Sequence, residues 1–371
     1  MIEPVGSGDN GLAVTLIVEQ LRRAVPGGTG TYVRELIRAL VARADLEART
    51  VTLYASRSYA HDDPIGDLGA PLRTTVVPGP LLTRLWELGT GPRVAHGGIV
   101  HAPSLAFPPT RLPFVVTIHD LAFQIVPETF TKHGRNWHER ALRRAARVAD
   151  AFVVPSDPVA TQLVGAGLGI VRDQVHVISE GSDHLGPPDQ EATRRFLDHL
   201  GVTGKFILSV GTIEPRKNLA RLIQAFDRVR DQLGEECTLV ICGPTGWMVD
   251  VEPTKGVVLA GHVSDSVLAG LYLTAQVVAY VPLAEGFGLP VVEAMRQGAV
   301  VLSSAVPSAR RGTYVIDPYD VDAIAEGLMC CAQDESLRKR LRADGIAYSE
   351  SLTWQHTAEE HLALWNEVAT R

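Results

Sequence analysis

The sequence predicts an α/β protein built from two doubly wound domains in tandem. Short continuous apolar runs alternate with segments whose apolar residues recur every three or four positions, as in buried parallel strands followed by amphipathic helices. This alternation occurs twice, and a segment rich in Gly, Pro and charge at 180–189 separates the two series. At 371 residues the chain is also too long for one ordinary core.

The expected elements follow from these runs in chain order. The first series of strands is expected at 13–18, 51–54, 98–101, 114–118 and 152–155, with helices at 31–43 and 137–149. The second series of strands is expected at 206–210, 238–242, 257–259, 277–281 and 300–303, and a last helix at 354–368. We therefore expect one domain over 1–185 and another over 186–352.

Composition excludes several classes of protein. A net charge of −7 argues against a general nucleic-acid binder. No apolar run reaches the roughly 18 residues of a membrane span, and residues 1–10 lack the features of a signal peptide. The four cysteines show no zinc spacing, and no His, Asp and Glu cluster has ligand spacing. We expect a cytoplasmic protein with no metal, no cofactor and no nucleic-acid partner.

Ligands of doubly wound sheets bind where strands end and loops lead into helices. The first such loop, Pro26 to Gly30, contains Gly27 and Gly28, which would let a phosphate approach the backbone at a helix start. It matches neither the dinucleotide fingerprint nor the P-loop, which disfavours a nicotinamide dehydrogenase. A plain tight turn explains the loop equally well.

A second loop, GTIEPRKN at 211–218, follows the expected strand 206–210. Asn218 is placed to cap the next helix, which would leave Arg216 and Lys217 facing the space between the domains. The fork of Arg and the point charge of Lys suit a departing diphosphate. The alternative is a solvated basic pair.

The third loop, EGFGLPVVE, carries the strongest signal. Glu285 precedes a helix whose first turn contains Pro290, and Glu293 lies about one turn inside that helix. Gly286 and Gly288 strip side chains from the approach, so that the backbone at 287–289 can meet an anion or sugar hydroxyls. Two carboxylates here suit the hydroxyls of a sugar and a ribose, since a bare anion would be repelled. A purely structural turn is the alternative.

Two further features are open to more than one interpretation. His119 follows the expected strand 114–118, where its ring could bond a reacting sugar or its acceptor, or serve the structure alone. The segment 135–147 carries five arginines that could touch anionic lipid or a phosphorylated acceptor. Most runs of this kind are simply solvated faces.

At these residues the sequence resembles the retaining glycosyltransferases of family 4, which have the GT-B fold. The resemblance covers nearly the whole chain and is carried by GGTGTYVRELIRAL, VVTIHDLAF, VVPSDPVATQL, SVGTIEPRKNLARLIQAF, GHVSD and EGFGLPVVE. It implies two Rossmann-like domains facing a cleft, with the first on the acceptor side and the second binding a nucleotide sugar. It also implies that residues 353–371 cross back to the first domain.

The resemblance implies roles for individual residues of the donor site. Gly27 and Gly28 would approach the donor phosphates, Arg216 and Lys217 would neutralise the diphosphate, and Val263 in GHVSD would lie by the base. The catalytic set would be His119, Arg216, Lys217 and Glu285. Glu285 would bind hydroxyls of the transferred sugar, while Glu293 binds the ribose. The backbone of Gly286, Phe287, Gly288 and Leu289 would complete the sugar site.

The expected reaction is retaining transfer of a hexose, first of all mannose from GDP-mannose, to a glycan or lipid-linked glycan, without a metal. UDP- and dTDP-sugars remain open, as does peripheral contact with the inner face of a membrane. Two alternatives are a GT-B enzyme that hydrolyses or epimerises the nucleotide sugar, and a non-catalytic partner subunit that binds it.

One departure from the family is the short segment after Ser308, where a Glu-Val-containing loop is usual.

Overall fold

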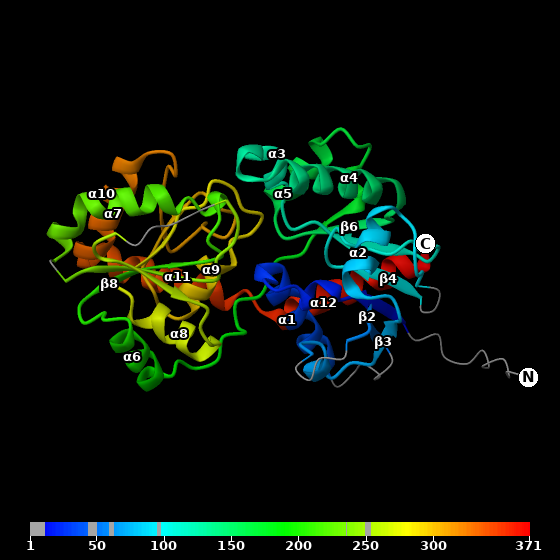
Figure 1. The fold of residues 1–371 in the computed structure, drawn as a ribbon, viewed down its shortest axis with the longest axis horizontal. Coiled ribbons are helices and arrows are strands. Elements are labelled where there is room, and N and C mark those ends of the chain that lie inside the picture. Colours follow the sequence, from blue (N-terminus) through cyan, green and yellow to red (C-terminus); the bar gives the residue numbers. More distant parts are fainter. Residues whose placement is uncertain (1–11, 44–49, 59–62, 95–97, 235, 249–253) are drawn as a thin grey trace, which may run out of the picture.

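The computed structural model describes residues 12–43, 50–58, 63–94, 98–234, 236–248 and 254–371. Two parallel sheets form two Rossmann-like domains, each with helices on both faces of its sheet (Figure 1). The expected α/β architecture of two doubly wound domains is confirmed. The first ten residues, on which the expected lack of a signal peptide rests, lie outside the described ranges.

The first sheet has the strand order β3-β2-β1-β4-β5-β6-β7, and its order reverses next to β1. Its strands are β1 Val14–Ile17, β2 Val51–Ser56, β3 Leu72–Thr75, β4 Ile99–Ala102, β5 Phe114–Thr117, β6 Ala151–Val154 and β7 Val175–Val177. The α-helices around it are α1 Gly27–Val41, α2 Gly79–Glu87, α3 Ala122–Ile125, α4 Lys132–Val148 and α5 Asp157–Gly165. Short 3₁₀ turns are η1 Glu19–Arg22, η2 Gly66–Leu68, η3 Pro127–Thr129 and η4 Arg172–Gln174.

The second sheet has the order β10-β9-β8-β11-β12-β13 and reverses next to β8. Its strands are β8 Phe206–Val210, β9 Thr238–Cys242, β10 Val257–Gly261, β11 Val277–Tyr280, β12 Val301–Ser304 and β13 Thr313–Ile316. Its helices are α6 Gln190–His199, η5 Pro215–Lys217, α7 Leu219–Leu233, α8 Asp265–Thr274, α9 Leu289–Arg296, α10 Val321–Gln333 and α11 Glu335–Glu350. The loops after β8 and β11 therefore flank a topological switch point, where ligands of such sheets bind.

Every strand expected from the sequence is present, with ends that differ by at most two residues. The sequence did not predict β3, β7 and β13, which lie at or beside the edges of the sheets. β3 is mostly exposed and β7 is only three residues long, so neither forms the continuous apolar run of a buried strand. β13 is likewise only partly buried.

The last helix, α12 Trp354–Thr370, leaves the second domain and packs beside α1 in the first, as the resemblance implies (Figure 1). Trp365 and His361 of α12 are fully buried there. The chain thus crosses between the domains twice, near residues 180–189 and at the start of α12. The domain boundaries at 185/186 and 352/353 stay predictions.

A buried chain of hydrogen bonds fixes α12 to the first sheet. His361 Nδ1 lies 2.7 Å from Thr357 O, which can only accept, so Nε2 accepts from the Tyr32 hydroxyl at 2.7 Å. Tyr32 in turn accepts from Thr117 Oγ1 at 3.2 Å, and Thr117 accepts from His101 Nε2 at 2.9 Å. Both rings are neutral in this arrangement, and burial lowers the pKa of His361 to about 4. The chain joins α12, α1, β5 and β4.

The segment 180–189, which separates the two series of strands, contains buried residues. Glu180 and Ser182 are buried, and Ser182 Oγ donates to Ser349 O at 2.8 Å. Gly181 lies so close to α12 that a Cβ would be 2.4 Å from Trp354 N. A residue without a side chain is therefore required at position 181, where the first crossing packs against the second.

We predict that Gly181→Ala destabilises the protein by about 1–3 kcal/mol, the usual cost of forcing atoms into a packed site. Gly186→Ala is the matched control, because a Cβ at Gly186 would meet nothing within 4 Å. Chemical denaturation of both variants measures the difference. Equal midpoints for the two variants would contradict the close packing of the two crossings.

Candidate functional site

The two domains touch at the loops that follow β5 and β6 in the first sheet and β11 in the second. Ser156, which precedes α5, donates its hydroxyl to Gly286 O at 2.7 Å. A Cβ on Gly286 would lie 1.6 Å from His119 O. Only a glycine permits this approach, which brings together two segments that the sequence singled out separately.

The predicted cationic pair contacts the predicted carboxylate directly. Lys217 Nζ lies 2.5 Å from Glu285 Oε1, and Arg216 Nη1 lies 2.6 Å from the same oxygen. Arg216 Nη2 also binds Glu214 Oε1 at 2.7 Å, and Lys217 Nζ donates to the Tyr280 hydroxyl at 2.9 Å. The side chains of Arg216, Lys217 and Glu285 are 15%, 13% and 11% exposed, so water screens these charges weakly.

This charge cluster fixes the protonation state of its members. Burial alone would raise the pKa of Glu285, but Arg216 and Lys217 outweigh it and lower that pKa to about 2. Burial raises the pKa of Glu214 even though Arg216 lies beside it. Glu214 Oε2 is buried without a hydrogen-bond partner. Glu285 is thus an ionised acceptor at neutral pH, while Glu214 is the carboxyl group in the cluster that protonates more readily.

The turn that holds the cations forms differently from the sequence prediction. Asn218 stands at the N-terminus of α7, but its side chain makes no cap hydrogen bond. Its backbone is left-handed, with φ of 60°, a conformation that Asn tolerates better than most residues. The amide donates instead to Val281 O at 3.1 Å and to Pro318 O at 2.7 Å. Asn218 therefore fastens η5 to the loop after β11, which carries Glu285.

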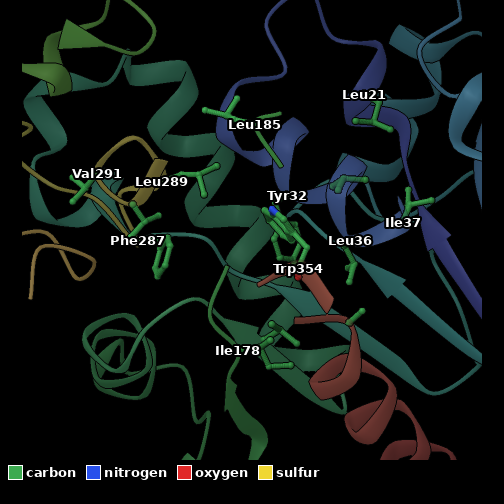
Figure 2. Packing of buried hydrophobic residues seen from close by; sticks show 14 of the residues in the cluster. Leu21, Tyr32, Leu36, Ile37, Ile178, Leu185, Phe287, Leu289, Val291 and Trp354 are labelled. Carbon is green, nitrogen blue, oxygen red and sulfur yellow. The ribbon is translucent and has the colours of Figure 1, made fainter. Parts of the chain in front are cut away.

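The glycine loop is packed into the protein, and Gly286, Phe287, Gly288 and Leu289 are all buried. Phe287 and Leu289 are each 6% exposed and point into the apolar cluster that also holds Tyr32, Leu185 and Trp354 (Figure 2). Helix α9 begins at Leu289, with Pro290 in its first turn as expected, so its first N–H groups have no intrahelical partner. Gly288 precedes it with φ of 99°.

The short segment after Ser308 closes onto this same loop. Ser308 N donates to Phe287 O at 3.0 Å and Ser308 Oγ donates to Gly288 O at 2.9 Å. A Cβ on Gly288 would lie 2.7 Å from Ser308 Oγ. The chain then reaches β13 at Thr313. Ser308 therefore supports the glycine loop through both its backbone and its side chain.

Glu293 lies within α9 as expected, and its side chain is only 9% exposed. Its Oε2 accepts from the Tyr272 hydroxyl at 2.8 Å, and its Oε1 lies 3.1 Å from His184 Nε2. Neither partner was predicted from the sequence. Both oxygens are engaged by the protein, and each keeps capacity to accept one further hydrogen bond.

The ring of His119 lies next to the domain contact, but protein groups face both of its nitrogens. Nε2 lies 3.0 Å from Pro103 O, so it carries a proton, and Nδ1 lies 3.5 Å from Glu180 Oε1. Burial lowers the pKa of His119, but Glu180 and Pro103 outweigh it and raise that pKa. The expected hydrogen bond from this ring to a sugar would have to replace one of these contacts. A role for His119 in transfer stays a prediction.

Three of the residues predicted to bind the donor make no hydrogen bond or ion pair with the charge cluster in the described part of the chain. Gly27 and Gly28 are the first residues of α1 rather than part of a loop before it, and a Cβ on either would meet nothing within 4 Å. Val263 follows β10, half-buried against the apolar cluster. Within the described ranges, no hydrogen bond or ion pair joins these residues to Arg216, Lys217 or Glu285. Their roles also stay predictions.

Sequence reasoning missed the partners that tertiary structure supplies. Glu214 had a signal, since it precedes Pro215 in the same loop as Arg216. Ser156 lies in VVPSDPVATQL, one of the segments that carry the resemblance, but was not singled out. His184, Tyr272 and Tyr280 had no signal, because each belongs to an ordinary strand, connection or helix and reaches the site only through folding.

The structure also bears on the expectations about metal ions and membrane spans. Among the residues it describes, no group of three or more His, Cys, Asp or Glu side chains is arranged to hold a metal ion. In the same part of the chain, no helix has the length and apolar character needed to span a bilayer.

The chain matches two family models that describe the two domains in turn. Residues 26–184 match Glycosyltransferase Family 4, and residues 193–347 match Glycosyl transferases group 1. O-antigen chain mannosyltransferase B of Escherichia coli is 28% identical over 272 residues, which cover 70% of this chain and 71% of that protein. The serotype-specific mannosyltransferase WbdA of Escherichia coli is 27% identical over 286 residues, 70% of this chain but only 34% of its own length.

Among solved structures, HepE of Anabaena in complex with UDP and glucose superposes with a TM-score of 0.72. It is 17% identical, and the match covers 96% of this chain and 99% of that one, which shows the shared fold. Together with the two family models and the mannosyltransferase relatives, this fold shows that the chain belongs to the family 4 type of glycosyltransferases, enzymes with the GT-B fold.

Proposed function

We propose that the enzyme transfers a hexose with retention of anomeric configuration, using no metal ion. The proposed donor is GDP-mannose and the proposed acceptor is a glycan or lipid-linked glycan. The observation that carries the proposal is Glu285, an ionised carboxylate held between Arg216 and Lys217 beside a glycine backbone. Mannose as the sugar is supported by the two mannosyltransferase relatives. HepE, whose structure contains UDP and glucose, keeps UDP-sugars open as donors.

The proposed mechanism uses Arg216 and Lys217 to stabilise the departing diphosphate. The bond between the anomeric carbon and the phosphate oxygen breaks, and the acceptor oxygen forms its bond on the same face. The leaving phosphate oxygen takes the acceptor proton, so no separate protein base is needed. The protein then supplies position and charge, which together lower much of the activation barrier in such reactions.

The charge balance of the cluster supports this use of the cations. Without donor, two carboxylates face the two cations, and the cluster is nearly neutral when both are ionised. Burial raises the pKa of Glu214, so an approaching diphosphate would favour its protonation. Protonated Glu214 leaves Arg216 free to turn its charge to the phosphates while Glu285 binds sugar hydroxyls.

The remaining donor contacts are proposed from their positions in the fold. Glu293 would bind the ribose, and the backbone of Gly286 to Leu289 would face the transferred sugar. Gly27 and Gly28, at the open start of α1, would approach the phosphates. Val263 would contact the base and His119 the sugar.

We predict that Glu285→Ala lowers sugar transfer by about 100-fold or more, because the site loses the carboxylate that contacts both Arg216 and Lys217. A panel of radiolabelled GDP-, UDP- and dTDP-sugars, assayed with and without EDTA, measures this loss. Glu191→Ala is the control, since that side chain is 69% exposed in α6. EDTA should leave turnover unchanged.

Strict dependence of turnover on added metal would contradict the mechanism. Free sugar or isomerised donor formed without acceptor would favour a hydrolase or epimerase. Donor binding with no turnover in any acceptor mixture would favour a partner subunit.

We further propose that the enzyme acts in the cytoplasm, in peripheral contact with anionic lipid through α4. This helix exposes three arginines, Arg140, Arg143 and Arg147. Apolar surface is exposed by Val148, at the end of α4, and by Ile125 of α3. Exposed cations and exposed apolar side chains on these two helices suit the boundary between lipid headgroups and acyl chains.

Replacing Arg140, Arg143 and Arg147 together by Ser should abolish co-sedimentation with phosphatidylglycerol vesicles. The matched control replaces three exposed cations of the second domain, Arg195, Arg228 and Lys339, and should bind as the wild type does. Wild-type binding should also weaken in high salt. Equal sedimentation of both triple variants would rule out α4 as the contact.

A further inference from the structure

His184 connects the two crossings of the chain to the candidate ribose carboxylate. It lies in the segment that leads from the first domain to the second, and its side chain is 6% exposed. Its Nε2 lies 3.1 Å from Glu293 Oε1, and Trp354 Nε1 lies 3.2 Å from its Nδ1. Trp354 is the first residue of α12, the helix that returns to the first domain. One imidazole therefore joins the outgoing segment, the returning helix and α9.

The hydrogen-bond directions along this connection follow from its two ends. An indole N–H can only donate, so Nδ1 of His184 accepts from Trp354. Nε2 therefore carries the ring proton and donates it to Glu293. Burial lowers the pKa of His184, but the hydrogen bond and charge of Glu293 outweigh it and raise that pKa. Protonation at Nδ1 would leave the bond from Nε2 to Glu293 in place.

The backbone around His184 is itself fixed. Trp354 N donates to Asp183 Oδ1 at 2.9 Å, and Ser182 N donates to Leu352 O at 3.0 Å. Gly181 packs against the same turn. His184 thus projects from an anchored segment, and its position relative to α12 is set by several bonds on either side.

The carboxylate of Glu293 depends on its two donors for orientation. The Tyr272 hydroxyl lies 2.8 Å from Oε2, and His184 holds Oε1. A buried carboxylate without such donors would be costly to ionise. With them, each oxygen keeps a lone pair directed away from its donor, and two adjacent hydroxyls of one ring can use that pair of sites.

We infer that His184 is a positioning residue for the donor nucleotide. It orients Glu293 toward the ribose hydroxyls and ties that orientation to Trp354, where the chain crosses between the domains. This inference rests on the proposed function, in which Glu293 binds ribose. It assigns His184 to recognition of the 2′- and 3′-hydroxyls rather than to the diphosphate or the sugar. Donors that lack these hydroxyls gain nothing from His184.

The test is isothermal titration calorimetry of the whole protein with GDP and UDP and with their 2′,3′-dideoxy counterparts. His184→Ala should weaken binding of the better-bound ribose nucleotide by about 10- to 100-fold, the usual effect of losing a hydrogen bond to a charged group. His184→Ala should bind the dideoxy counterpart with the same affinity as the wild type does. In steady-state assays the donor KM should rise while kcat changes little, as for lost ground-state binding.

His184→Gln should restore most of the affinity, because its amide can donate to Glu293 from about the place of Nε2. Trp354→Phe, which removes only the indole donor, should give a smaller loss with the same dependence on the ribose hydroxyls. His199→Ala, at an exposed position on α6, is the control and should bind as the wild type does. Thermal melting of each variant shows that it is folded.

Equal weakening for the ribose and dideoxy nucleotides would overturn the inference in favour of a purely structural role. Unchanged affinity in His184→Ala, or no recovery in a folded His184→Gln, would overturn it too. Failure of the wild type to bind any nucleoside diphosphate would instead remove the proposed function, and the inference with it.

Discussion

The ion cluster of Arg216, Lys217 and Glu285 is the interaction on which the rest of the site depends. A carboxylate that is 11% exposed stays ionised only because two cations lie within 2.6 Å of one of its oxygens. These groups come from two loops, after β8 and after β11, so the cluster forms only if both strands lie side by side at the switch point of the second sheet. Asn218 holds the two loops together through backbone carbonyls rather than by charge.

The second constraint is the return of α12 to the first domain. Its start holds His184 through Trp354, and its middle holds Tyr32 through His361. Tyr32 meets the ring of His119 edge-on, with centroids 4.8 Å apart. One helix therefore supports groups on both sides of the domain contact. The polar side chains of His361, Tyr32, Thr117 and His101 are therefore buried between α12 and the first sheet, where they bind one another.

The sequence predicted those parts of the fold whose signal is local. Buried strands such as β8 and β9 appear as unbroken apolar runs, whereas the exposed edge strand β3 does not. The loops with Gly27, Arg216 and Glu285 were found because glycines, charges and helix starts recur at strand ends. The prediction that the Asn218 side chain caps α7 was wrong, since neither a left-handed backbone nor bonds to two distant carbonyls can be predicted from the local sequence.

Contacts between distant segments account for the rest. His184 meets Glu293 across 109 positions of chain, and Ser156 meets Gly286 across 130. Glu180 and Ser182 are buried, and Ser182 binds the carbonyls of Ser349 and Leu352, which lie far away in the sequence. Local patterns predict candidate site residues, while the folded structure determines which of these residues contact one another.

We propose that Arg216 and Lys217 bind the diphosphate of a nucleotide as well as Glu285. The most direct measurement compares the affinities of GDP and UDP with those of guanosine and uridine, in the wild type and in Arg216→Met. Arg228→Met, which removes a half-exposed ion pair, is the control. The account predicts that the wild type prefers the diphosphates and that Arg216→Met loses about 10-fold or more of this preference, while nucleoside binding stays the same. An undiminished preference for diphosphates in Arg216→Met would contradict it.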